Sequence, residues 1–169
     1  MAATEQVQGS DLDRIYMKQA ISLANQSVAT DSAYCVGAVL VVPTPLSQSL
    51  HPTVFTGFSR ELPGNTHAEQ VCLVKAEQAA VSSQALCDAA MYTTMEPCSL
   101  RLSGNVSCAT RLVKAGIRRV VIGILEPPNL VAQCSGVQML LDAGIQVVHL
   151  IGFRDECLAP NNHIVTTAC

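Results

Sequence analysis

The sequence contains no tryptophan and few other aromatic residues, with three Phe and three Tyr among 169 residues. A core without large rings must be built mainly from Val, Leu, Ile and Ala, and 49% of the residues are hydrophobic. Such a composition suits an α/β domain with buried parallel strands. The length is sufficient for one core. We therefore expect residues 1–169 to form a single domain.

Runs of Lys or Arg are also missing, and the formal net charge is -3. A protein that binds long nucleic acids normally has a basic face, so the composition argues against a nucleic-acid partner and favours a small-molecule ligand. No apolar stretch is long enough to span a membrane. The first residues have neither the basic start nor the apolar run of a signal peptide. We expect a cytoplasmic protein without a membrane partner.

Eight cysteines are present, but their spacing is irregular and no secretory signal accompanies them. In a reducing compartment, free thiols or metal ligands are the better interpretation than disulfides.

Periodicity predicts the element order α-β-β-α-β-α-β-α-β. Ser10 and Asp13 form a capping box for a helix over about residues 11–26, and a second helix is expected over 66–80. Two later helices end at Gly116 and Gly144, each followed at once by a strand, as in parallel α/β units. A continuous β-branched run predicts a strand over 35–42, and further strands are expected over 53–57, 89–94, 117–122 and 145–150.

This order favours a three-layer α/β/α sandwich around a five-stranded mixed sheet, with the first two strands paired as a hairpin. Residues 1–9 are polar and are expected to be loose. Residues 151–169 show no clear period, so we expect an irregular C-terminal tail.

One His, one Glu and two Cys stand where an α/β sheet gathers its ligands, at strand ends and helix starts. His67 and Glu69 open the helix after the second strand, Cys98 follows the third strand, and Cys108 lies near the start of the next helix. One imidazole and two thiolates leave a fourth position of a tetrahedral zinc ion open for water. Glu69 is then the group that moves protons to and from that water.

Taken singly, a Cys in an apolar chain is more often a core residue than a ligand, and H-x-E alone occurs by chance. The joint pattern favours zinc. A non-catalytic zinc module is an alternative, but structural zinc normally has four protein ligands, and no fourth stands at suitable spacing. We assign the remaining thiols to the core or surface, namely Cys35, Cys72, Cys87, Cys134, Cys157 and Cys169.

His67-Ala68-Glu69 followed by Pro97-Cys98 and a further Cys resembles the zinc-dependent cytidine-deaminase superfamily, whose signature is H-x-E with P-C-x-x-C. Here nine residues, not two, separate Cys98 from Cys108. That wider gap is similar to the pyrimidine deaminases of riboflavin biosynthesis. The blocks 57–69 and 96–105 resemble the fungal type, and the resemblance covers roughly residues 30–150.

The resemblance implies one zinc ion per chain, bound by His67, Cys98 and Cys108, with Glu69 as the proton shuttle. It also implies substrate contacts from the loops beside these ligands. Ala33 stands where bacterial forms place an Asn, so these contacts are less well matched than the metal ligands. The substrate-binding candidates are Arg60, Asn65, Ala68, Arg101, Ser103 and Asn105.

The implied reaction is hydrolytic deamination of a phosphorylated ribitylamino-diaminopyrimidinone to the pyrimidinedione, by a protein that we expect to be a homodimer. The ribityl and ribosyl forms of the substrate both stay open. Deamination of a cytidine or deoxycytidine nucleotide or nucleoside, or of a base in RNA, is the alternative within enzymes. An RNA editor should have a basic channel and stacking aromatic residues, which this composition disfavours.

Overall fold

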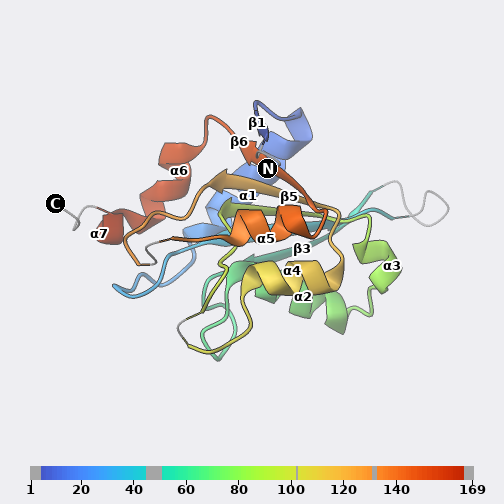
Figure 1. The fold of residues 1–169 in the computed structure, drawn as a ribbon, viewed down its shortest axis with the longest axis horizontal. Helices are drawn as coiled ribbons and strands as arrows, with labels where there is room; N and C mark the ends of the chain where they lie inside the picture. Colours follow the sequence, from blue (N-terminus) through green and yellow to red (C-terminus); the bar gives the residue numbers. More distant parts are fainter. Residues whose placement is uncertain (1–4, 45–50, 102, 131–132, 166–169) are drawn as a thin grey trace.

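The computed structural model describes residues 5–44, 51–101, 103–130 and 133–165. One mixed sheet of six strands runs through this part of the chain in the order β1-β6-β5-β4-β2-β3 (Figure 1). Its strands are β1 (Glu5–Val7), β2 (Gly37–Val42), β3 (Thr53–Phe58), β4 (Ala90–Met95), β5 (Arg119–Ile124) and β6 (Gln146–Leu150).

The pairing follows the predicted units. Strands β2 and β3 form an antiparallel hairpin, β2 also runs antiparallel to β4, and β4, β5 and β6 are mutually parallel. The glycines that close the two α/β connections, Gly116 and Gly144, have φ values of 70° and 78°. A residue with a Cβ would be strained there.

The predicted number of five strands is wrong, because residues 5–7 add a sixth. These residues were expected to be loose, but β1 pairs parallel with β6 in the register Glu5 to Val148 and Val7 to Leu150. The strand has three residues and two of them are polar. It therefore has no apolar run from which a strand could be recognised in the sequence.

Helices cover both faces of the sheet, which gives the predicted three layers. The helices are α1 (Asp11–Ala24), α2 (Ala68–Gln78), α3 (Ser83–Leu86), α4 (Cys108–Ala115), α5 (Gly136–Asp142), α6 (Arg154–Leu158) and α7 (Asn162–Val165), with a 3-10 turn η1 (Ala159–Asn161). One buried cluster joins the sheet to α2, α4 and α5, and a second joins it to α1 and α6.

The C-terminal segment was expected to be irregular, but residues 154–165 are helical. Phe153, Cys157 and Ile164 are buried in the cluster shared with α1, and the Arg14 guanidinium carbon lies 4.8 Å from the centre of the Phe153 ring. Residues 166–169 of the predicted tail lie outside the described residues.

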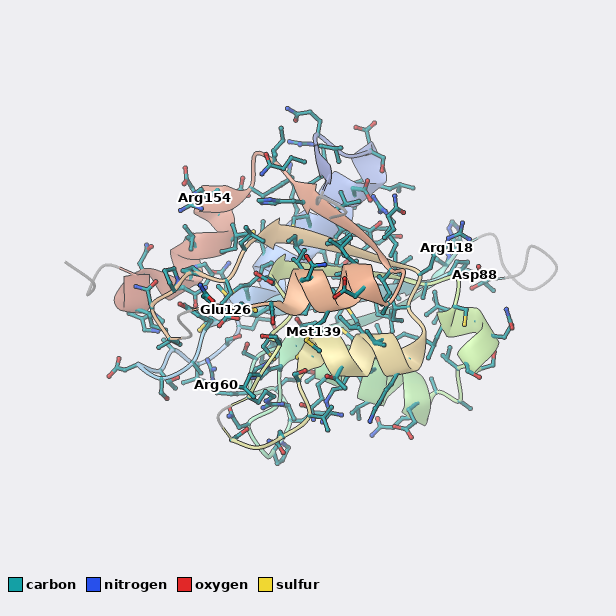
Figure 2. The ribbon with its side chains drawn as sticks, in the orientation of Figure 1. Arg60, Asp88, Arg118, Glu126, Met139 and Arg154 are labelled. Atoms are coloured by element: carbon teal, nitrogen blue, oxygen red, sulfur yellow. The ribbon has the colours of Figure 1, made fainter. Side chains whose placement is uncertain are left out.

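Charged side chains lie at both ends of the parallel strands. Arg118 and Asp88 form an exposed ion pair of 3.5 Å at the end where β5 begins, whereas Arg60 and Glu126 lie at the other end (Figure 2). No helix in the described part of the chain has the length and apolar character needed to cross a membrane.

Candidate metal centre and active site

His67 is fixed at the start of α2 by the packing of that helix against β3. Its backbone is extended, with φ -91° and ψ 157°, and it forms the N-cap of the helix. Gly57 of β3 allows this approach, because a Cβ there would collide with the carbonyl oxygen of Ala68. The hydroxyl of Thr66 accepts a hydrogen bond from the Leu62 N–H at 3.1 Å and donates one to the Leu62 carbonyl oxygen at 2.9 Å. These two hydrogen bonds join the ends of the turn 62–66 that directly precedes His67.

Cys98 and Cys108 are brought together where β4 ends and α4 begins. Ser107 is the N-cap of α4, so Cys108 is the first residue of the helix. The Cys108 N–H donates to the Cys98 sulfur at 3.3 Å, and the Ala109 N–H donates to the Cys98 carbonyl oxygen at 3.1 Å. The positive end of the helix dipole therefore faces Cys98, which favours its thiolate form.

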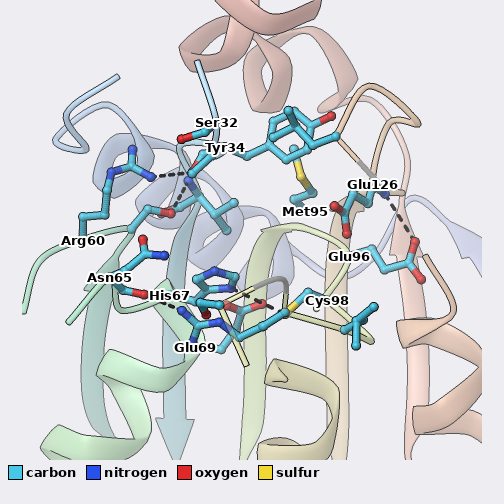
Figure 3. A pocket seen from close by; sticks show the side chains of 17 residues that line it. Ser32, Tyr34, Arg60, Asn65, His67, Glu69, Met95, Glu96, Cys98 and Glu126 are labelled. Carbon is cyan, nitrogen blue, oxygen red and sulfur yellow. Dashed lines mark hydrogen bonds between the residues drawn. The ribbon is translucent and has the colours of Figure 1, made fainter. Parts of the chain in front are cut away.

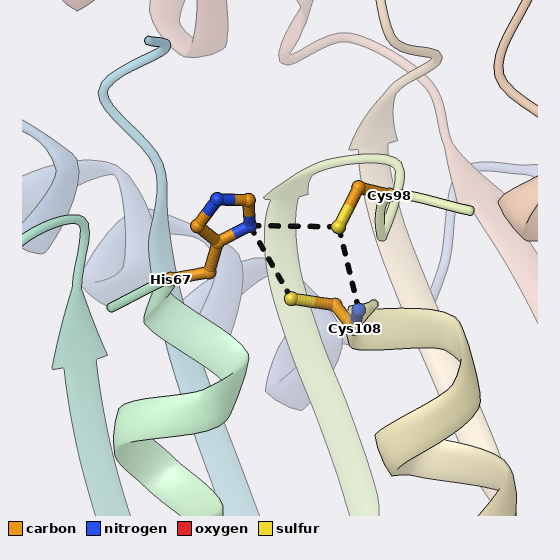
Figure 4. A group of neighbouring side chains, drawn as sticks. All are labelled: His67, Cys98 and Cys108. Atoms are coloured by element: carbon orange, nitrogen blue, oxygen red, sulfur yellow. Dashed lines mark hydrogen bonds between the residues drawn. The ribbon is translucent and has the colours of Figure 1, made fainter. Parts of the chain in front are cut away.

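The side chains of His67, Cys98 and Cys108 converge as predicted (Figure 4). The Nδ1 atom of His67 lies 3.5 Å from each sulfur, and the three donor atoms all lie within 4.8 Å of one another. Across the described ranges, this is the one group of at least three His, Cys, Asp or Glu side chains that could bind a metal ion. One nitrogen and two sulfurs fit zinc and leave one tetrahedral position free.

The two thiols share a proton unequally. A hydrogen bond from Cys108, together with the nearby His67, lowers the pKa of Cys98 to about 4 despite its burial. The same bond and complete burial raise the pKa of Cys108 well above its usual value. Without a metal, Cys98 is therefore the more acidic thiol of the pair, and binding of a metal ion by both sulfurs would release the proton of Cys108.

Glu69 lies in the first turn of α2, two residues after His67, and is 3% exposed. The Thr93 hydroxyl of β4 lies 3.4 Å from its Oε1 atom. Burial, followed by the negative charge of Cys98, raises the pKa of Glu69. A carboxyl whose pKa is raised can hold and release a proton more readily near neutral pH, which suits a general acid and base.

A cavity of about 140 Å³ opens above these groups. Figure 3 shows its walls, with Ser32 and Tyr34 on one side, Met95 and Glu126 facing them, and His67 and Cys98 at the base. Seventeen residues line it, and they come from the loops before β2 and after β3, β4 and β5, from the last residue of β4 and from the first turn of α2. The cavity therefore lies at the carboxyl ends of the parallel strands, as expected for this class of fold.

The predicted substrate contacts are only partly placed in this cavity. Arg60, Asn65, Arg101 and Ser103 line it, whereas Ala68 and Asn105 do not. Ala68 is fully buried in the core, and Asn105 is exposed in the loop before α4.

The guanidinium of Arg60 is bound to the protein itself. It donates to the carbonyl oxygen of Tyr34 at 3.2 Å and also to that of Val28. Figure 3 shows the side chain directed toward Tyr34 rather than toward His67. Arg60 therefore fixes the wall of the cavity, whether or not it also contacts a ligand.

Arg101 has a similar double role. It is 6% exposed, and it donates to Oε1 of Gln70 at 2.9 Å and to the carbonyl oxygen of Asn65. These bonds join the loop between the two cysteines to the loop that carries His67. Both halves of the metal site are thereby held in one position.

Sequence reasoning missed three residues that shape the cavity. Tyr34 and Glu126 line it from loops without periodicity, and the Tyr34 hydroxyl donates to the Pro127 carbonyl oxygen at 2.9 Å. Glu96, next to Pro97, accepts hydrogen bonds from the backbone N–H groups of Val137 at 2.9 Å and Glu126 at 3.3 Å. The signal available for Glu96 was a charged residue directly after a buried strand and before Pro-Cys.

Comparison with known families decides the assignment. The family described as cytidine and deoxycytidylate deaminase zinc-binding region matches residues 10–124, which include all three candidate ligands and Glu69. The chain belongs to this family. The His, Cys, Cys group is thus the candidate zinc site of a zinc-binding deaminase family.

Individual relatives point to one branch of the family. The chain is 45% identical to the Schizosaccharomyces pombe diaminohydroxyphosphoribosylamino-pyrimidine deaminase over 143 residues. The alignment covers 85% of this chain and 33% of that protein. The Aquifex aeolicus riboflavin biosynthesis protein RibD is 33% identical over 138 residues, covering 81% of this chain and 34% of RibD. The chain thus spans about a third of the length of these curated relatives.

A solved deaminase, in a form with its C-terminus deleted, has a similar fold. The crystal structure of Aspergillus oryzae Rib2 deaminase in complex with DARIPP matches with a TM-score of 0.72 and 32% identity, covering 88% of each chain. The predicted resemblance to fungal riboflavin-biosynthesis deaminases is confirmed, as is the three-layer mixed-sheet class of the fold.

Proposed function

We propose that the chain catalyses the hydrolytic deamination of a phosphorylated ribitylamino-diaminopyrimidinone to the corresponding pyrimidinedione in riboflavin biosynthesis. One observation carries this proposal: a buried carboxyl, Glu69, stands beside a three-donor metal group at the base of a cavity. The 45% identity to the S. pombe pyrimidine deaminase supports this substrate class.

His67, Cys98 and Cys108 would hold the zinc ion. When bound, zinc supplies Lewis acidity, which lowers the pKa of a water molecule at an open position. The loop and helix contacts described above fix these side chains before substrate enters, so little reorganisation is needed during the reaction.

Glu69 does the proton transfer. Its carboxylate accepts a proton from the attacking water and gives it to a ring nitrogen as the oxygen bonds to the amino-bearing carbon. It then passes the second proton of the water to the amino group, which leaves as ammonia while a carbonyl forms. Each turnover consumes one water and returns Glu69 to its starting state. Burial and the nearby Thr93 hydroxyl keep the carboxyl at one position for both transfers.

The cavity walls supply the groups for substrate binding. We propose that Asn65 and Ser103, with Arg60 and Arg101 behind them, contact the phosphorylated chain. Ala68, through its backbone, and Asn105 stay weaker candidates because neither lines the cavity. Glu126 adds an acceptor for ring N–H or amino groups.

The test measures ammonia release from the ribityl and the ribosyl forms of the substrate, side by side, and from deoxycytidine monophosphate. Glu69→Gln should lower kcat by about 10²–10⁴-fold, while the zinc content should stay at one per chain. Glu77→Gln, an exposed glutamate of the same helix, is the control and should be fully active. A parent protein that releases ammonia only from the cytosine nucleotide would assign the chain to the alternative, nucleotide deamination. Zinc binding without any turnover would indicate a binding module.

Three broader features belong to the same proposal. Residues 1–169 would form one deaminase domain, which is supported by a sheet that includes strands from both ends of the described chain. We propose a cytoplasmic homodimer whose partner is a small phosphorylated pyrimidine, without nucleic acid or membrane. The absence of basic runs and the net charge of -3 support this choice of ligand. Sedimentation of the zinc-loaded protein would test the dimer.

A further inference from the structure

A buried amide from the C-terminal helices binds the backbone of the cavity wall. Asn161, the last residue of η1, is fully buried. Its Oδ1 atom accepts a hydrogen bond from the Cys35 N–H at 2.6 Å, and its Nδ2 group donates to the Cys35 carbonyl oxygen at 3.1 Å. The two residues are 126 positions apart, and Asn161 lies beyond the region that the family model matches.

The backbone N–H and C=O groups of Cys35 lie beyond the end of the sheet, where no neighbouring strand forms hydrogen bonds with them. The ladder between β2 and β3 begins at Gly37 and Phe58, so Cys35 stands before the strand. Cys35 is 1% exposed, and a buried N–H or C=O without a partner is costly. The side-chain amide of Asn161 replaces the missing neighbouring strand by offering one acceptor and one donor to the same residue.

Three successive N–H groups are held in this way by side chains from separate elements. Cys35 N–H donates to Asn161, Val36 N–H to Oγ of Ser59 at 3.0 Å, and Gly37 N–H to Oγ1 of Thr94 at 3.2 Å. Of these three side chains, only that of Asn161 comes from outside the sheet and its loops. Residues 34–36 are therefore positioned by the C-terminal segment as well as by the sheet.

The segment held by these hydrogen bonds forms one wall of the cavity. Ser32, Ala33, Tyr34 and Val36 all line the cavity. A shift of the Cys35 peptide would move the residues on either side of it. Asn161 itself cannot follow such a shift easily, because Cys157 and Ile164 anchor its helical segment in the core.

We propose that Asn161 is a positioning residue for the substrate cavity, which holds the 32–36 wall through the Cys35 peptide. The inference rests on the proposed function for its kinetic consequence, but its structural part is independent of any substrate. It gives the C-terminal helices a role in the shape of the binding site, apart from their packing against α1.

The experiment compares zinc-loaded Asn161→Ala and Asn161→Asp with a matched control, Asn25→Ala. Asn25 makes the same kind of bond, from its amide to the Ile21 carbonyl oxygen at 2.9 Å, at the exposed end of α1. Hydrogen exchange is read at the Cys35 and Val36 amides, and KM and kcat are read from ammonia release.

We expect Asn161→Ala to speed exchange at Cys35 by at least about tenfold and to raise KM by about tenfold, with kcat changed less than about twofold. Asn161→Asp keeps the acceptor, so Cys35 N–H should stay more protected than in Asn161→Ala. Asn25→Ala should leave exchange at Cys35 and both kinetic constants at the parent values.

Unchanged exchange at Cys35 in Asn161→Ala, or an unchanged KM despite faster exchange, would overturn the proposal. If Asn161→Ala does not fold, the parent decides: its Cys35 amide should exchange as slowly as that of Val39 in β2, and rapid exchange there refutes the contact. A parent that releases no ammonia from any pyrimidine would refute the proposed function but leave the exchange result intact, so the two failures are distinguishable.

Discussion

Glu96→Gln tests whether the metal-binding loop depends on a buried carboxylate. Glu96 is 7% exposed, and its two oxygens accept N–H groups from Val137 and Glu126, which lie on different segments. A glutamine in the same place can accept only one of these bonds, because its amide nitrogen would face the second N–H. The substitution thus leaves one buried donor without a partner.

The expected cost follows from these two bonds. Losing a hydrogen bond to a charged group costs about 1.5–3 kcal/mol, and making the other one neutral costs about 1 kcal/mol. The free energy of unfolding should therefore fall by roughly 2.5–4 kcal/mol. For a chain of this size each kcal/mol shifts Tm by about 2–4 °C, so Tm should fall by about 5–16 °C.

Urea and thermal unfolding of the zinc-loaded protein measure this loss, with Glu77→Gln as the control that should change the free energy of unfolding by less than about 0.5 kcal/mol. Hydrogen exchange at the Val137 amide shows whether the lost stability comes from the hydrogen bond to Glu96. If Glu96→Gln unfolds at the same urea concentration as the control, and Val137 exchanges at the parent rate, then the carboxylate does not tie these segments together and the reasoning is refuted.

Three further predictions concern the ion pair of 2.6 Å between Arg119 of β5 and Asp13 of α1, the metal ligands and a close packing contact. Burial raises the pKa of Asp13, but the hydrogen bonds led by Arg119 outweigh it and hold the pKa well below its usual range. The contribution of Asp13 to the free energy of unfolding should therefore be constant above about pH 5 and fall as the pH drops below it, and urea titrations below about pH 5 should show a shallower fall in Asp13→Asn than in the parent. Cys108→Ser should lower the zinc content measured by atomic emission to well below one per chain, and a variant that retains full zinc would contradict the assigned ligand set. Gly136→Ala places a Cβ against the Pro97 carbonyl oxygen, so overpacking should lower the free energy of unfolding by about 1–3 kcal/mol. It should also lower zinc affinity in a chelator competition. Parent-like values for both would show that the loop moves aside without cost and would contradict the prediction.

The sheet and its helices were largely predictable because their residues carry strong local signals. Continuous β-branched runs and the helix–Gly–strand repeat predicted the five longer strands. The C-terminal helices were missed because the inward positions 153, 157 and 164 are interrupted by Asn161, a polar residue, and by Pro160. An apolar period cannot reveal a buried amide whose partner is 126 residues away.

The candidate site shows the same division. His67, Cys98, Cys108 and Glu69 were predictable because their chemistry and order are specific to a metal-assisted reaction, and the donor atoms do converge. The direction of the arginine side chains was not predictable. The guanidinium of Arg60 points where the folded backbone offers carbonyl oxygens, and the sequence does not show which carbonyls a loop will expose.

Each cysteine ligand has an anchor of its own. The backbone of Cys98 is held by the segment that Glu96 and Pro97 fasten to the start of α5, and Cys108 is seated by the cap of α4. These two anchors fix both ends of the loop between the thiols. The loop also contributes Arg101 and Ser103 to the cavity wall, and Arg101 joins it to the segment that carries His67. A change in the loop would therefore alter the cavity and the support of the metal ligands together.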